Sequence, residues 1–367
     1  MSIDAGNRRA QRIESYDWLK LFGALAIVIG HYAAMFPNGN QVSVFQNGFL
    51  GIIARHGGAA VALFLQISGY TTMSNFYNKK TGGIKSYLLP KILRLWPLHF
   101  CTMLFCFVVQ QIRIACGMEY YIYQANSLTD VIINSFFGGH FVTPELSLNG
   151  PAWTMSVTFF CYIAFWVIMK LDHKVNHNYV FAALTIFFTY DLYMVLSGLN
   201  SGFPYIVDSV QYAAAFFIGC LLFEICRKTS EDVRLKNILD KVCIGILIGM
   251  AVLFLNYDKI KLFGIDGFEI FYIYILSPLL ILLFRGDKIN AFLGKIPPKF
   301  RIARELFFPI YLIHFPLMLL FRTLEEMNII SINYASVSFF VIWLVVIIIS
   351  AGIVAFLERK RQIRWIK

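Results

Sequence analysis

The amino-acid sequence predicts an all-α polytopic membrane protein with about ten transmembrane helices and both termini in the cytoplasm. Of its 367 residues, 58% are hydrophobic and only 14% are charged, a composition that cannot be packed inside a soluble globule. Apolar runs of about 17 to 25 residues, the length that crosses a hydrocarbon core of about 30 Å, recur along the whole chain. Lys and Arg gather in alternate connections between these runs, as the excess of positive charge in cytoplasmic loops predicts.

Ten apolar runs define the predicted helices. In chain order they span residues 18–36, 59–77, 97–116, 153–171, 179–199, 206–226, 238–256, 267–284, 302–324 and 333–357. The first run is too long for a cleavable signal peptide and lacks a small-residue cleavage site, so we expect it to stay as an anchor. The longest stretch predicted outside, 117–152, is too short for more than a folded loop, and residues 1–367 are therefore expected to form one transmembrane domain without an appended soluble domain.

The charges in the connections support each predicted helix in turn. With the N-terminus inside, six cytoplasmic segments hold 26 of the 32 Lys and Arg residues. In order they carry Arg8, Arg9 and Arg12; Lys79, Lys80, Lys85, Lys91 and Arg94; Lys170 and Lys174; Arg227, Lys228, Arg234, Lys236 and Lys241; Arg285, Lys288, Lys295, Lys299, Arg301 and Arg304; and Arg359, Lys360, Arg361, Arg364 and Lys367. Only Arg55, Arg113, Lys259, Lys261 and Arg322 fall outside, and Lys20 lies within the first span.

The remaining composition excludes several other classes of function. The net charge of +11 is spread over short loops that face anionic lipid, which does not favour a nucleic-acid partner. The seven cysteines lie in or beside apolar runs without a CxxC pair and are interpreted as small core side chains. His173 and His177 have i,i+4 spacing but no third ligand nearby, so no metal site is predicted.

Two histidines inside predicted spans are the first candidates for chemistry. His31 lies 13 positions after Trp18 and His314 lies 12 after Ile302, in spans that both run from inside to outside. At about 1.5 Å per residue, both imidazoles are predicted roughly 20 Å from the cytoplasmic boundary. Ionisable groups in membranes are costly and usually face a cavity or a partner. A shared site is therefore predicted; the alternative is that each is a core histidine bonded to a neighbouring helix.

A basic loop after the second span supplies a second candidate. Lys91 and Arg94 lie three positions apart in KILRLWP, so they share one helical face at the membrane surface. Arg offers a fork to phosphate oxygens and Lys a point charge, which favours a phosphorylated cosubstrate arriving from the cytoplasm. The alternative interpretation is an ordinary positive-inside loop.

Taken together, these residues resemble acyltransferase family 3, integral membrane proteins that move acyl groups from cytoplasmic acyl-CoA to extracytoplasmic glycans. The resemblance covers nearly the whole chain. It rests on YDWLK followed by His31, similar to the family's Asp-x-Leu-Arg and intramembrane His; on FLQISGY, similar to Phe-Phe-x-x-Ser-Gly-Phe; on KILRLWP, similar to Arg-x-x-Arg-x-x-Pro; on AWTMSVTFFCY, similar to Trp-Ser-Leu-x-x-Glu-x-x-Phe-Tyr; and on IYLIHFP, similar to Tyr-Leu-x-His-x-Pro.

The resemblance implies a role for each matching residue. His31 is implied as the principal catalytic residue, either as general base on the acceptor hydroxyl or as a relay for the acyl group, with Asp17 and Lys20 shaping the mouth of the site. Lys91 and Arg94 are implied to bind the CoA phosphates, and Ser68 and Gly69 to line the cofactor pocket. Trp153, Tyr311 and His314 are implied to contact substrate or other groups of the site.

Three positions depart from the family's pattern. Lys20 stands where the family usually has Arg, and Lys91 replaces the first Arg of the pair, so the charge is kept and the fork geometry is lost. Thr158 occupies the usual Glu position in AWTMSVTFFCY. A role that needs a carboxylate there is absent or moved, as in a divergent subfamily with another acceptor or in an inactive member.

The predicted function is therefore an O-acyltransferase of the bacterial inner membrane. It would carry an acyl group, acetyl in the commonest case, from acetyl-CoA to a hydroxyl of a cell-surface polysaccharide or another extracytoplasmic or lipid-linked glycan, without a metal. A neutral His can take the proton of the attacking hydroxyl. The competing prediction is a proton-coupled transporter or exporter of a polar or lipid-linked solute. Two observations count against it: the sequence has no visible pair of repeats with broken helices, and the basic pair Lys91 and Arg94 suits an acyl-CoA.

Overall fold

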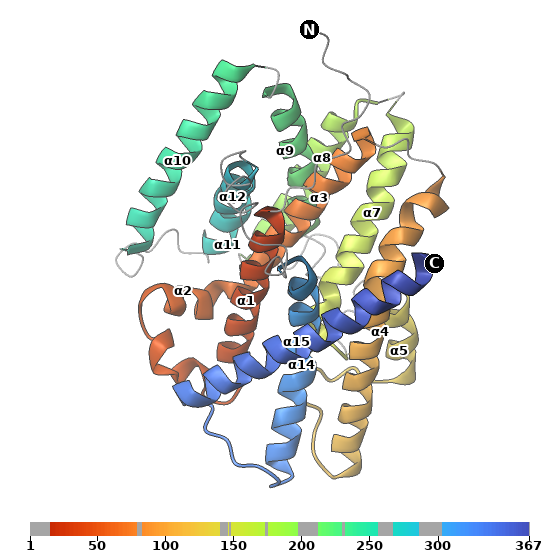
Figure 1. Ribbon diagram of the computed structural model, residues 1–367, viewed down its shortest axis with the longest axis vertical. Coiled ribbons are helices and arrows are strands. Elements are labelled where there is room, and N and C mark those ends of the chain that lie inside the picture. Colours follow the sequence, from red (N-terminus) through yellow and green to blue (C-terminus); the bar gives the residue numbers. More distant parts are fainter. Residues whose placement is uncertain are drawn as a thin grey trace.

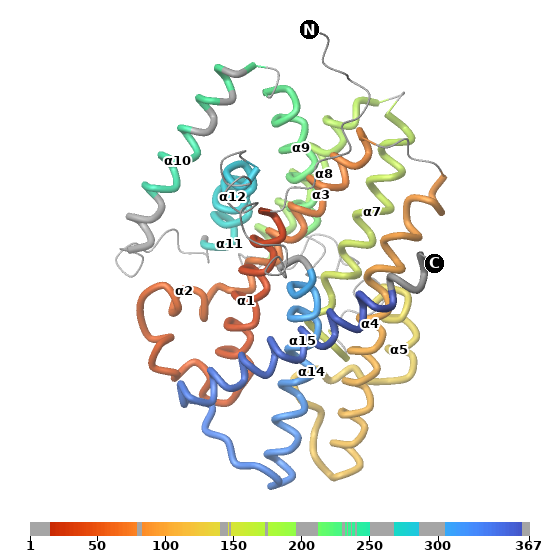
Figure 2. The backbone as a smooth tube through the Cα atoms, in the orientation of Figure 1, coloured from red at the N-terminus to blue at the C-terminus, as the bar shows by residue number. Residues whose placement is uncertain are grey.

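The computed structural model describes residues 15–78, 83–139, 146, 148–172, 175–196, 212–229, 232–255, 267–285 and 303–366. This part of the chain is helical, with no β-strand among its elements (Figure 1). Several predicted residues lie outside it: His173, and the cations Arg8, Arg9, Arg12, Lys79, Lys80, Lys174, Lys259, Lys261, Lys288, Lys295, Lys299, Arg301 and Lys367. Figure 2 follows the described course as a tube.

A helix coincides with each predicted span. The helices are α1 (Ser15–Met35), α3 (Ala60–Asn78), α4 (Ile84–Ala115), α7 (Trp153–Leu171), α8 (His177–Leu196), α9 (Ala213–Thr229), α10 (Val233–Leu255), α11 (Gly267–Phe271) continued by the π-helix η7 (Tyr272–Leu276) and α12 (Ser277–Phe284), α14 (Ala303–Glu326) and α15 (Val337–Ile366). Within the described residues, seven helices are long and apolar enough to cross a membrane. The all-α membrane fold is thus confirmed, whereas ten crossings and cytoplasmic termini stay predictions.

Helix α4 begins well before the predicted span 97–116, so the basic pair, which was predicted on one helical face of a loop, lies within the helix. The helix starts at Ile84 and contains both Pro90 and Pro97. A proline inside a helix frees the carbonyl four residues earlier, and for Pro97 this is the carbonyl of Leu93. Arg361 Nη2, from the end of α15, donates a hydrogen bond to that oxygen at 3.4 Å. A helix can continue through proline where such a partner is present, and the basic pair therefore lies on a helix.

The segment between α4 and α7 contains a short helix that lies beside α4. Near one end of α4, Arg113 Nε donates to the carbonyl of Glu119 at 3.0 Å, and Trp96, roughly 25 Å back along the helix, donates to the carbonyl of Ser135 at 2.8 Å. Helix α5 (Leu128–Ser135) thus lies back along α4. It exposes one apolar stripe at four-residue spacing, which suits contact with lipid; the stripe is Leu128, Ile132 and Phe136.

The connection from α1 to α3 also returns toward the middle of the bundle. It contains η1 (Gly39–Gln41), η2 (Ser43–Phe45), α2 (Gly48–His56) and η3 (Gly57–Ala59). Gly57 lies so close to α1 that a Cβ atom there would be 2.1 Å from the carbonyl oxygen of Ala26. Only glycine permits this approach. Helix α3 consequently begins beside the middle of α1, with Ala60 facing Gly23.

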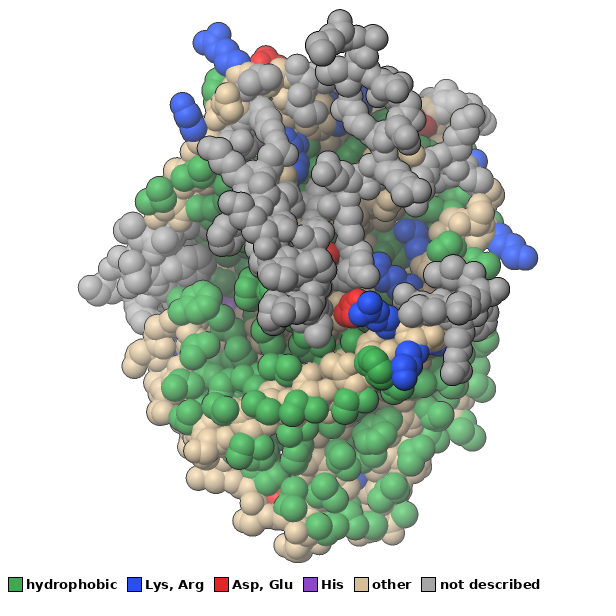
Figure 3. Space-filling view, in the orientation of Figure 1, with side chains coloured by type: hydrophobic (Ala, Val, Ile, Leu, Met, Phe, Trp, Pro, Cys, Tyr) green, Lys and Arg blue, Asp and Glu red, His purple; other side chains and the backbone are tan. Residues whose placement is uncertain are grey.

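Helices α1 and α14 form the centre of the molecule and run in the same direction (Figure 1). Lys20 Nζ lies 5.2 Å from the centre of the Phe307 ring near the start of both helices. Further along, His31 and His314 are in contact. Their parallel course matches the prediction that both spans run from inside to outside. Charge is uneven on the face drawn in Figure 3, where Lys and Arg lie mostly in the half nearer the N-terminus and hydrophobic side chains cover the other half.

Candidate active site

A pair of histidines joins α1 to α14. His31 Nδ1 lies 2.7 Å from His314 Nε2, and the two rings are stacked with their centres 5.0 Å apart. His314 is fully buried, while His31 is partly exposed. His314 Nδ1 lies 2.6 Å from the carbonyl oxygen of Tyr311. Of the four ring nitrogens, only His31 Nε2 has no hydrogen bond within the described part of the chain.

Pro316, at the end of IYLIHFP, explains how one turn of α14 is held. Pro316 frees the carbonyl of Leu312, and Asn149 Nδ2 donates to that oxygen at 2.9 Å and to Thr102 Oγ1 at 3.1 Å. Asn149 lies just before η4 (Gly150–Ala152). The turn of α14 that carries His314 is therefore anchored by a side chain from another segment, as prolines in membrane helices require.

A cleft opens between the helices on the Lys91 side of this pair. It has a volume of about 190 Å³ and receives side chains from α1, α3, α4, α7 and α14. Its lining residues are Lys20, Phe64, Leu65, Ser68, Thr71, Thr72, Asn75, Lys91, Arg94, Leu95, Thr154, Met155, Thr158, Tyr162, Phe307, Phe308 and Tyr311. Three of them are cations and none is acidic. The cleft is therefore positively charged, which suits an anionic ligand.

Lys91 is placed by aromatic rings. Its Nζ lies 4.0 Å from the centre of the Tyr162 ring and 4.7 Å from that of Tyr87, in the range of cation–π attraction. Ser68 Oγ and Tyr162 Oη are hydrogen-bonded at 2.8 Å. Arg94 is exposed. None of the salt bridges among the described residues includes Lys91 or Arg94, although Glu358 of α15 is near enough to Arg94 to interact with it electrostatically.

Tyr311 links the cleft to the histidines. Its ring meets Phe64 edge to face at 5.7 Å and lines the cleft, and His314 follows one helical turn later with the ring centres 6.0 Å apart. The Tyr311 hydroxyl donates to the carbonyl of Pro151 and is bonded to Thr154 Oγ1 at 2.9 Å. Because its proton is taken by the Pro151 carbonyl, this hydroxyl holds α14 against η4.

The other predicted residues lie in different surroundings. Lys20 and Ser68 line the cleft, but Gly69 packs against α9, where a Cβ atom would be 1.9 Å from the carbonyl oxygen of Phe216. Asp17 is buried near the start of α1. Trp153 stands at the start of α7, with its ring 5.3 Å from that of Tyr212.

Thr158 lies on the wall of the cleft, so the position where a carboxylate was expected does face this space. Sequence reasoning did not single out Phe64, Tyr162, Asn149 or Thr154. Tyr162 ends the motif AWTMSVTFFCY and was visible in it, whereas Asn149 and Phe64 carry no local signal of their contacts. In the part of the chain that the structure describes, no group of three or more His, Cys, Asp or Glu side chains is placed to hold a metal ion.

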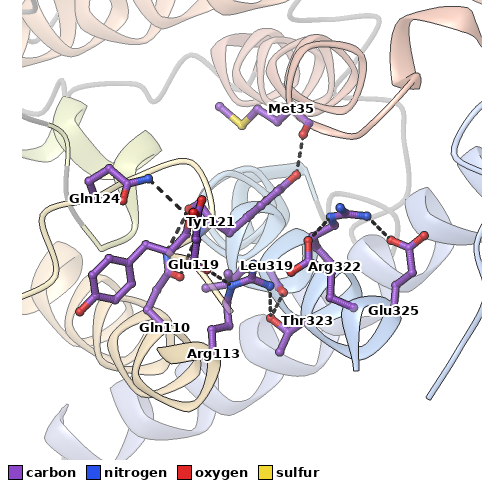
Figure 4. A network of polar contacts seen from close by, with 12 residues as sticks. Met35, Gln110, Arg113, Glu119, Tyr121, Gln124, Leu319, Arg322, Thr323 and Glu325 are labelled. Carbon is purple, nitrogen blue, oxygen red and sulfur yellow. Dashed lines mark hydrogen bonds and ion pairs between the residues drawn. The ribbon is translucent and has the colours of Figure 1, made fainter. Parts of the chain in front are cut away.

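An ion-pair network closes the far end of α4 and α14 (Figure 4). Arg113, which is buried, contacts Glu326 at 2.5 Å and donates to Thr323 Oγ1 at 3.3 Å. Arg322 pairs with Glu326 at 2.8 Å and with Glu325 at 2.5 Å. These are two of the five cations predicted outside. Each of the two is thus paired with a carboxylate near the end of α14.

Comparison with known proteins matches residues 13–358 to the acyltransferase domain model of acyltransferase family 3. The chain belongs to this family. No curated protein and no solved structure matches it significantly. With its apolar helices, this acyltransferase 3 protein is a multi-pass membrane acyltransferase.

Proposed function

We propose that this acyltransferase 3 protein transfers an acyl group, acetyl in the first instance, from acyl-CoA held in the cleft to a hydroxyl of an extracytoplasmic or lipid-linked glycan. We further propose that it acts in the bacterial inner membrane and that His31 serves as general base or acyl relay. The observation that carries the proposal is the arrangement of the site: Tyr311 lines a cleft that has three cations and no acidic residue in its wall, and His314 follows one turn further along the same helix, with the two ring centres 6.0 Å apart.

The donor half of the proposal rests on charge. Lys91 and Arg94 lie on one face of α4, and Lys20 lies in the same cleft. A CoA carries phosphates at one end and the thioester at the other, so phosphates bound by Lys91 and Arg94 would leave the pantetheine arm directed along the cleft. Arg binds phosphate through paired hydrogen bonds, and Lys91 is held over two rings that limit its motion.

The chemical half rests on His31. Attack of a hydroxyl on a thioester needs a base for the hydroxyl proton and stabilisation of the oxyanion that develops on the carbonyl. His31 is partly exposed and has one ring nitrogen without a protein partner in the described residues. Its position beyond the cleft, toward the predicted outside, suits an acceptor that arrives from the face opposite to CoA.

The test is transfer of label from acetyl-CoA carrying a labelled acetyl group. Membranes containing the protein are incubated with the donor, and label is followed into glycan, lipid-linked and protein fractions. We expect His31→Ala to lower transfer by about 10²–10⁴-fold. The control is His99→Gln, which changes another buried histidine whose Nε2 bonds the carbonyl of Asn134 at 3.0 Å. If the His31→Ala variant transferred label at the wild-type rate, the proposed role of His31 would be refuted.

Binding of acetyl-CoA tests the donor half separately. We expect Arg94→Ala to weaken it about tenfold, because a charge-assisted hydrogen bond to phosphate is lost. Arg234→Ala on α10, an exposed cation away from the cleft, serves as the matched control and should bind as the wild type does. If the wild type neither binds nor transfers label from any acyl-CoA, the transporter alternative takes its place.

A further inference from the structure

We infer that His314 is a positioning residue: it holds His31 in the tautomer with the proton on Nδ1 and so leaves Nε2 as the atom that accepts the hydroxyl proton. This inference rests on the proposed function and specifies how its site works. The juxtaposition that carries it is a chain of two short contacts, from His31 Nδ1 to His314 Nε2 at 2.7 Å and from His314 Nδ1 to the carbonyl of Tyr311 at 2.6 Å.

The carbonyl oxygen of Tyr311 determines which nitrogen carries each proton in this chain of contacts. A carbonyl oxygen only accepts hydrogen bonds, so His314 Nδ1 must carry a proton and donate it to Tyr311. In a neutral imidazole the other nitrogen then has a lone pair and no proton. His314 Nε2 is therefore an acceptor, and His31 Nδ1 must be the donor to it. The proton of His31 is fixed on Nδ1, and its Nε2 keeps a free lone pair.

The opposite arrangement would require a charged His314 that donates from both nitrogens. Burying an unpaired imidazolium costs several kcal/mol, and His314 is fully buried. None of the ion pairs among the described residues includes either histidine. The neutral pair is therefore the favoured state. Histidine in water prefers the proton on Nε2, so without His314 this base would mostly hold its proton on the wrong nitrogen.

In the proposed reaction, His31 Nε2 both accepts the proton and returns it. His31 Nε2 takes the acceptor hydroxyl proton while the hydroxyl oxygen bonds to the thioester carbonyl carbon. The C–S bond breaks as the tetrahedral intermediate collapses, and the CoA sulfur leaves with the proton from Nε2. During this cycle the imidazolium of His31 is stabilised by donating from Nδ1 to His314 Nε2. If an acyl-His intermediate forms instead, the same nitrogen is the nucleophile.

Two substitutions separate this role from a merely structural one. His314→Gln can place an amide oxygen near the position of Nε2 and so keep an acceptor for His31. His314→Asn can place an amide nitrogen near the position of Nδ1, which keeps the bond to Tyr311 and leaves His31 without its acceptor. We expect kcat of the Gln variant to stay within about tenfold of the wild type and that of the Asn variant to fall about 100-fold, as for residues that orient a ligating or reacting imidazole. Acetyl-CoA binding should be unchanged in both.

The tautomer can also be measured without turnover. In protein labelled with ¹⁵N-histidine, the signals of His31, identified by their loss in His31→Ala, should show a protonated Nδ1 and an unprotonated Nε2. In His314→Asn they should shift toward the form protonated on Nε2. The inference is overturned if the Asn variant turns over at least as fast as the Gln variant, or if wild-type His31 is protonated on Nε2. Failure of the proposed function is distinct, because the wild type would then transfer no label.

Discussion

Substitution of Gly69 by Ala should destabilise the protein without weakening acyl-CoA binding by the folded fraction. A Cβ atom at this position would lie 1.9 Å from the carbonyl oxygen of Phe216 and 2.9 Å from its carbon. Both atoms belong to the backbone of α9, so no side chain can rotate away. Across the same interface, a Cβ at Gly219 would lie 2.0 Å from the carbonyl oxygen of Gln66. The two glycines thus set how closely α3 and α9 approach.

The loss of stability in Gly69→Ala follows from the overlap of its Cβ atom with the backbone of α9. Ordinary van der Waals contact begins near 3.4 Å, so the two helices must separate locally by more than an ångström, and overpacking of this kind costs about 1–3 kcal/mol. The gain in helix propensity from Gly to Ala, about 1 kcal/mol, offsets only part of that cost. Gly352→Ala on α15, where a Cβ would meet nothing within 4 Å, is the matched control and should be neutral or stabilising.

Thermal unfolding of the purified protein in detergent measures the effect. We expect the midpoint of Gly69→Ala to fall by several degrees and that of Gly352→Ala to stay or rise. Acetyl-CoA affinity, normalised to folded protein, should not change in either variant. A Gly69→Ala protein as stable as the wild type but with weakened donor binding would refute the packing argument and restore Gly69 to the cofactor pocket.

Three further predictions concern other contacts. Glu326→Leu should lower the free energy of unfolding by about 3–5 kcal/mol, because buried Arg113 loses its carboxylate partner. In thermal unfolding, the double variant Arg113→Met/Glu326→Leu should recover much of this loss. A double variant no more stable than Glu326→Leu alone would count against the reasoning. Asn149→Leu should cost about 1–3 kcal/mol by leaving the proline-freed carbonyl of α14 without a donor, which a wild-type unfolding midpoint would contradict. Tyr162→Leu should weaken acetyl-CoA binding roughly twofold to fivefold by removing the ring beneath Lys91, whereas Tyr162→Phe should not; equal losses in the calorimetric titration would argue for the hydroxyl instead.

Helix α4 shows that its start and its surroundings depend on contacts between residues far apart in the sequence. The basic pair was predicted on one helical face of a loop, and the structure places it within a helix that contains two prolines. Arg361, more than 250 residues away in the chain, supplies a donor for the carbonyl of Leu93 that Pro97 leaves without its helical partner. The same holds for the return of α5 along α4. Its short apolar stripe is visible in the sequence, but its position depends on the contacts of Trp96 and His99 with its carbonyls.

The sequence alone determined the class of the protein, the approximate positions of the long helices and the family, because these depend on composition, on run lengths set by the bilayer and on local motifs. It also singled out His31 and His314 as groups at equal depth, since the rise per residue converts position in a span into depth. Equal depth in the membrane does not determine which faces of the two helices are in contact. Only the tertiary structure decided that the two rings touch, that the Tyr311 hydroxyl is committed to Pro151 and that Gly69 serves packing, because each of these depends on how helices rotate and approach one another.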